Sequence, residues 1–158
     1  MSSVLAYPSA DFPAPVGVRL DCPEGWVPLP EVALPLALAQ VVPAGQFRPN
    51  VIVVVSRSRK PFTVREAADE VVARLTGVDG FTEMGRQELE VGGLEGFRME
   101  GAFPDASGGT LVQAVRTTVV DRGPVVDIVQ VTGSCAGTQA ATVLAEIRAI
   151  QESLQLEV

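Results

Sequence analysis

Runs of apolar residues predict strands along most of this chain, and two segments with apolar residues every three to four positions predict helices. The strongest strand pattern is residues 51–57, where the first five positions are β-branched and therefore suit a pleated sheet. The other predicted strands are 16–20, an extended piece starting at Trp26, 34–42, 82–91, 94–103, 110–121 and 125–132.

The first helix is predicted over residues 63–76. Thr63 and Glu66 have the spacing of a capping box, and apolar residues recur on one side of a 3.6-residue period until Gly77. The second helix is predicted over residues 138–153. Its apolar stripe consists of Val143, Leu144, Ile147, Ile150 and Leu154.

The order of these elements predicts an α+β fold. Three strands and the short extended piece at Trp26 precede the first helix, and four strands joined by short turns precede the second, which favours an antiparallel sheet of six to seven strands. The middle strands carry apolar residues on both faces, so we expect one helix on each face, as a three-layer sandwich. Residues 1–15 are rich in proline and predict a flexible N-terminal arm, and residues 16–158 predict a single domain.

The hairpin over residues 82–103 carries many charges. Alternation along its strands predicts that Arg86, Glu88 and Glu90 share a solvated face with Arg98 and Glu100. The same reasoning places Glu83 and Glu95 on the other face. We therefore expect a solvated edge with cross-strand ion pairs rather than a carboxylate metal site.

Composition excludes several classes of function. The formal net charge of −7 argues against tight binding to nucleic acids or to anionic membrane surfaces. The chain contains no histidine, which excludes Ser-His-Asp triads and histidine-ligated metals. No uninterrupted apolar segment is long enough to span a membrane and no signal peptide is visible, so we expect a cytoplasmic protein with two free thiols, Cys22 and Cys135.

Short motifs in a fixed order resemble a known family. The strand over 18–20 followed by Pro23-Glu24-Gly25-Trp26 resembles the start of the PsbP-like superfamily. Phe47-Arg48-Pro49-Asn50-Val51 resembles the strand entry of its actinobacterial LpqN-like branch. Gly96-Phe97 and the final Ser153-Leu154 also fit, so the resemblance covers residues 16–156. It departs from that branch in having no lipobox cysteine near its start.

The resemblance to the PsbP-like superfamily implies an antiparallel sheet sandwiched by helices. The superfamily includes photosystem II extrinsic subunits, a Ran-binding nuclear import factor and adaptor chaperones of secretion systems. These are largely binding proteins without a shared catalytic residue set, so the resemblance carries no active site and no cofactor to this chain.

Four basic residues at the junction of the strongest strand and the first helix are the one local positive feature, namely Arg57, Arg59, Lys60 and Arg65. As a site they would contact an acidic partner or an anion, and the alternative is a group of solvated charges. Cys135, just before the second helix, is either a thiol activated by a helix N-terminus or a small buried residue. Trp26 either lines a pocket or fills an edge of the core.

These observations favour a non-enzymatic interaction module, an adaptor or accessory protein that binds another protein or a second copy of itself. No catalytic, cofactor or metal site is predicted. The alternative is a carrier of a small apolar ligand or lipid between sheet and helix, which would require a cavity of at least ~300 Å³.

Overall fold

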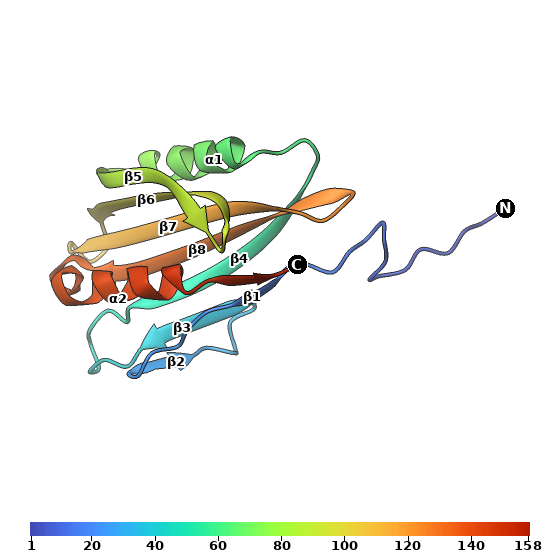
Figure 1. Cartoon of the computed structure of the whole chain (residues 1–158). Coiled ribbons are helices and arrows are strands. Elements are labelled where there is room, and N and C mark those ends of the chain that lie inside the picture. Colours follow the sequence, from blue (N-terminus) through green and yellow to red (C-terminus); the bar gives the residue numbers. More distant parts are fainter.

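A computed structural model describes the whole chain, residues 1–158, and shows a seven-stranded antiparallel sheet with a helix on each face (Figure 1). The strand order is β2-β3-β4-β8-β7-β6-β5. The elements are β1 (Gly17–Arg19), β2 (Trp26–Pro28), β3 (Leu36–Gln40), β4 (Asn50–Arg59), α1 (Val64–Thr76), β5 (Thr82–Val91), β6 (Leu94–Pro104), β7 (Thr110–Asp121), β8 (Val125–Ala136), the 3₁₀ turn η1 (Gly137–Gln139), α2 (Ala140–Glu152) and β9 (Gln155–Glu157). The α+β prediction is confirmed.

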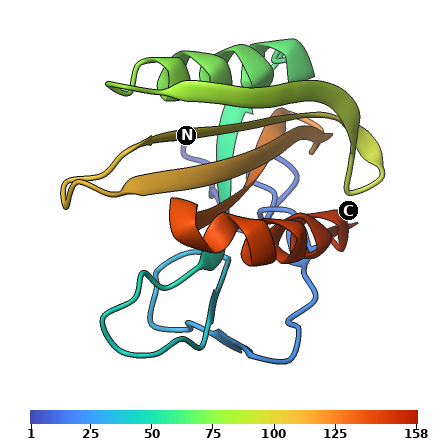
Figure 2. The same cartoon turned by 90° about the vertical axis from the view of Figure 1, so that its left-hand side faces the viewer.

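Helix α1 begins at the capping box that the sequence predicts. The Thr63 hydroxyl accepts from the Glu66 amide at 3.2 Å, and the Glu66 carboxylate accepts from the Thr63 amide at 3.3 Å. Its buried face, which includes Val71 and Leu75, packs on β6 and β7 in a small apolar cluster with Met99. Figure 2 shows α1 and α2 on opposite sides of the central strands.

Helix α2 closes the other face of the sheet over the main apolar core. Ile147 is fully buried there, against Gly133 of β8. A Cβ at position 133 would lie 2.2 Å from Ile147 Cγ2, so glycine is what lets the helix approach the strand this closely. Most of the core side chains come from α2, β4, β7 and β8, among which Val51, Val53, Val129 and Val131 are fully buried.

Residues 1–15 form no helix or strand and extend away from the sheet (Figure 1). The chain joins the domain at Asp127, a buried carboxylate that accepts from the Val16 amide at 2.9 Å, while Arg122 donates to the Ala14 carbonyl at 2.7 Å. The first strand pairs with the C-terminal strand β9, which the sequence pattern did not predict. No helix in the structure has the length and apolarity that crossing a membrane requires.

The expected arrangement of charges on the β5–β6 hairpin is wrong. The two-residue turn at Gly92-Gly93 pairs odd positions of β5 with even positions of β6, so that Glu88 lies opposite Phe97. Arg98 and Glu100 therefore point to the α2 side, away from the face of Glu88, and Glu100 is only 3% exposed.

The placement of Glu83 and Glu95 on the opposite face from Glu88 is also wrong. Glu95 pairs directly with Glu90 across the hairpin and shares its face. A bulge between Glu83 and Gly85 shifts the alternation of β5 and brings Glu83 to the side of Arg86.

Candidate functional site

The sheet face on the α1 side is covered only in part. Helix α1 packs on β6 and β7, and the neighbouring strands β8 and β4 present half-exposed side chains on the same face. We call this surface the open face and define it by Ile52, Val54, Ile128, Gln130 and Thr132. The strand register places these side chains in one continuous block, with Ile52 opposite Thr132 and Val54 opposite Gln130.

A cation from α1 forms one border of the open face. With the Gln130 amide oriented to accept, Arg74 donates to its side-chain oxygen at 3.0 and 2.6 Å. The surface therefore combines β-branched apolar side chains with an amide, a hydroxyl and an arginine. This mixture is typical of protein-binding surfaces, where an apolar centre has a polar rim.

A concave feature lies between α1 and the β5–β6 hairpin. It is an open cleft of about 460 Å³. Ala68, Val72 and Phe97 contribute apolar surface to it, and charged side chains such as Arg65 and Glu88 also line it. The cleft exceeds the ~300 Å³ that a carrier of a small ligand would need, although it is open to solvent rather than enclosed.

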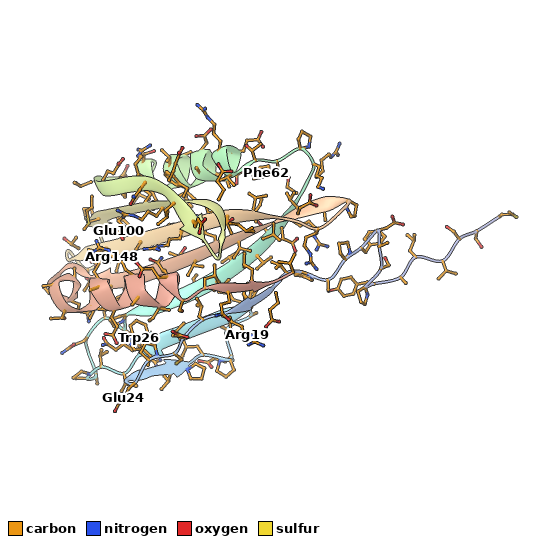
Figure 3. All side chains as sticks on the ribbon, viewed as in Figure 1. Arg19, Glu24, Trp26, Phe62, Glu100 and Arg148 are labelled. Atoms are coloured by element: carbon orange, nitrogen blue, oxygen red, sulfur yellow. The ribbon has the colours of Figure 1, made fainter.

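The α2 side of the sheet contains a buried ion cluster centred on Glu100. Arg148 of α2 donates to its two carboxylate oxygens at 2.9 and 2.5 Å, and Figure 3 shows the two residues side by side. Arg98 lies 3.6 Å from the same carboxylate. Burial by itself would raise the pKa of Glu100, but the Arg148 hydrogen bonds and the charges of Arg148, Arg98 and Arg116 outweigh burial and hold this pKa below 4.5.

Arg116 completes the cluster at the α2–sheet contact. It is 6% exposed, lies directly opposite Arg98 on the neighbouring strand, and has its Nη2 atom 3.4 Å from Glu152. Burial lowers its pKa. The signal that sequence reasoning missed was three charged residues inside strands that otherwise pack a core: Arg98, Glu100 and Arg116.

The structure does not bring the four basic candidates together. Arg57 binds the buried Asp127, with Nε 2.8 Å from Oδ1, and this hydrogen bond raises the pKa of Arg57. Lys60 lies 2.6 Å from Asp121. Arg65 stands on α1 at the cleft, and Arg59 is exposed at the end of β4. A role for these residues in partner binding stays a prediction.

Cys135 is fully buried at the end of β8, and burial raises the pKa of its thiol. An activated nucleophile needs the opposite shift, so the interpretation as a small buried residue fits better. Cys22 is exposed, and both thiols are free. Trp26 fills an edge of the main core at 5% exposure, with its indole N–H 2.7 Å from Glu146. No three acidic or cysteine side chains lie close enough to hold a metal ion.

Comparison with known proteins identifies structural relatives. The crystal structure of LpqN from Mycobacterium tuberculosis, involved in cell envelope biogenesis, superposes with a TM-score of 0.78 at 18% identity, covering 89% of this chain and 83% of that one. The solution structure of cyanobacterial PsbP (CyanoP) from Synechocystis sp. PCC 6803 gives 0.57 at 13% identity, over 99% and 98% of the two chains. The Saccharomyces cerevisiae Ran-binding protein Mog1p gives 0.56 at 10% identity, over 88% and 89%.

At these identities the structural matches establish the fold and not the function. A comparison with curated proteins found no significant match. The family model described as "Probable lipoprotein LpqN" matches residues 6–157, nearly the whole chain. The protein therefore belongs to the LpqN family, within the PsbP-like fold that its sequence motifs resemble.

Proposed function

We propose that this protein is a non-catalytic interaction module that binds another protein through the open face. The observation that carries the proposal is the incomplete cover of the sheet on the α1 side. Ile52, Val54 and Ile128 stay half-exposed there, whereas α2 closes the other face over a core of fully buried valines. Contiguous apolar surface of this kind on a soluble domain marks sites of interaction.

The shape of the open face supports a protein partner rather than a small ligand. It lies on adjacent strands of one sheet, and none of its residues lines the cleft beside α1. One protein of the same fold, Mog1p, is a Ran-binding protein, and a structural relative in this family is involved in cell envelope biogenesis. These relatives support a binding role for this chain without specifying its partner.

The partner must be in the same cellular compartment as this protein. There are two expectations for that compartment. The sequence favours the cytoplasm, whereas the family description refers to lipoproteins. Fractionation of cells that express the full chain would distinguish a membrane-associated pool from a cytoplasmic one.

A pair of charge-matched variants tests the proposal. Ile128→Arg places a charge on the open face, at the end nearest Ser56, and Thr142→Arg places the same charge on the exposed side of α2. We expect Ile128→Arg to weaken partner binding about tenfold or more, because the arginine must be desolvated at the interface, and Thr142→Arg to bind like the wild type. The measurement is quantitative capture of the partner from an extract, followed by titration of the captured protein.

Circular dichroism of both variants shows whether each is folded. Equal capture by wild type, Ile128→Arg and Thr142→Arg would place the binding surface elsewhere and overturn the proposal.

The cleft beside α1 favours a second candidate function, the carrier of a small apolar ligand. Its volume of about 460 Å³ is sufficient, and Ala68, Val72 and Phe97 supply apolar contact. Native mass spectrometry of the purified chain distinguishes the two functions, since a carrier retains a small molecule and the interaction module does not.

A further inference from the structure

We propose that the free edge of strand β5 pairs antiparallel with β5 of a second copy of this chain. The resulting homodimer would have one continuous sheet. This inference goes beyond the proposed function, because the dimer contact uses the edge of the sheet and not the open face. Whether the chain dimerises is therefore independent of whether the open face binds another protein.

The two edges of the seven-stranded sheet differ in how well they are protected. At one edge, β2 is three residues long and ends in Pro28, which has no amide hydrogen to donate. At the other edge, β5 runs for ten residues, Thr82–Val91, and contains neither proline nor lysine. Its bulge lies near one end, between Glu83 and Gly85, so that Gly85–Val91 is a regular edge. A long edge without these residues presents backbone donors and acceptors on which another strand can pair.

The charges of β5 select a second copy of the same strand. Two copies of β5 that pair antiparallel are related by a twofold axis. If both α1 helices lie on the same side of the joined sheet, one residue of β5 lies on this axis and faces its own copy, and that residue defines the register. With Gln87 on the axis, Arg86 of each copy lies directly opposite Glu88 of the other, which gives two ion pairs. With Glu88 on the axis, Arg86 faces Glu90, but the two Glu88 carboxylates face each other and repel. With Arg86 on the axis, the two guanidinium groups face each other. Among these three registers, only the one centred on Gln87 pairs opposite charges without placing like charges opposite each other.

The single protomer leaves these charges incompletely paired. Arg86 binds Glu83 through Nε at 2.9 Å and Nη2 at 2.5 Å, but Glu88 has no cation within 4.0 Å. In the proposed dimer each Arg86 lies between Glu83 of its own chain and Glu88 of the second copy. The dimer therefore supplies a partner for a carboxylate that has none in the protomer.

Charge reversal at these two positions provides the test, read as mass by sedimentation velocity over a concentration series. We expect the wild type to shift from 16.6 kDa towards twice that mass as concentration rises. Arg86→Glu alone and Glu88→Arg alone should each raise the dissociation constant of the dimer about tenfold or more, because each faces like charges across the axis. An equimolar mixture of the two variants should recover the dimer, since each new acid then faces a new base.

Glu70→Arg on the exposed side of α1 is the matched control and should dimerise like the wild type. A wild type that stays at 16.6 kDa at every concentration would overturn the inference. Single variants that dimerise as well as the wild type, or a mixture that stays monomeric, would overturn it too. Thermal melts of each variant test whether a change in mass comes from unfolding instead of from loss of the dimer. None of these outcomes bears on capture of a different protein by the open face.

Discussion

Glu100→Gln is expected to lower the free energy of unfolding by about 1 to 3 kcal/mol at neutral pH. The substitution keeps the shape of the side chain but leaves three arginines, Arg98, Arg116 and Arg148, around a neutral group beneath α2. Removing one partner of a buried ion pair is costly because the remaining charges lose their compensation. The loss is smaller than for a fully buried pair, because Arg148 and Arg98 are partly exposed to water. Urea unfolding of both proteins, followed by circular dichroism, measures the difference.

The same variant should change how stability depends on pH. The pKa of Glu100 is lowered by folding, so its contribution is present above its ordinary value of 4.5 and is lost as pH falls through the folded pKa. As the pH falls below 4.5, the free energy of unfolding of the wild type should therefore decrease more steeply than that of Glu100→Gln. Glu24→Gln, on the exposed turn before β2, is the control and should stay close to the wild type. A Glu100→Gln protein as stable as this control would show that the cluster contributes little.

Ile147→Ala is expected to cost about 2 to 5 kcal/mol. Ile147 is fully buried between α2 and the sheet, and its Cγ2 atom occupies the space that Gly133 leaves open. Truncation of Ile147 would leave a cavity beside Gly133. No side chain at position 133 could move to fill this cavity, because glycine has none. Chemical denaturation under two-state conditions gives the value.

Ile128→Ala removes the same atoms from the open face and serves as the matched control. Its side chain is partly exposed, so the loss in stability should be smaller, about 1 to 2 kcal/mol. Equal losses of stability in the two variants would contradict the difference in cover between the two faces of the sheet.

The sequence predicts most of the fold because its strongest patterns are local. The capping box of Thr63 and Glu66 starts α1 at the expected residue, and the β-branched run after Asn50 forms a central strand. Strand β9 was missed because a three-residue strand has no period, and its pairing with β1 depends on the ends of the chain meeting in space.

The surfaces were harder to predict, since they depend on where the helices lie across the sheet. A 13-residue helix is about 20 Å long and cannot cover seven strands, but nothing in its sequence says that it packs on β6 and β7. The basic candidates are close in sequence, yet Arg57 points towards Asp127 while Arg65 lies on α1 on the other side of the sheet. Glu100 was misplaced because the hairpin turn, and not strand alternation alone, decides which residues share a face.

Site-specific photo-crosslinking in cells that express the full chain tests directly whether the open face binds a protein. A photoreactive amino acid is placed at Val54, in the centre of the open face, and in a second protein at Ala145, exposed on α2. We expect a discrete protein adduct from position 54 that Ile128→Arg abolishes, and no such adduct from position 145. The same adducts from both positions, or an adduct only from position 145, would contradict binding through the open face.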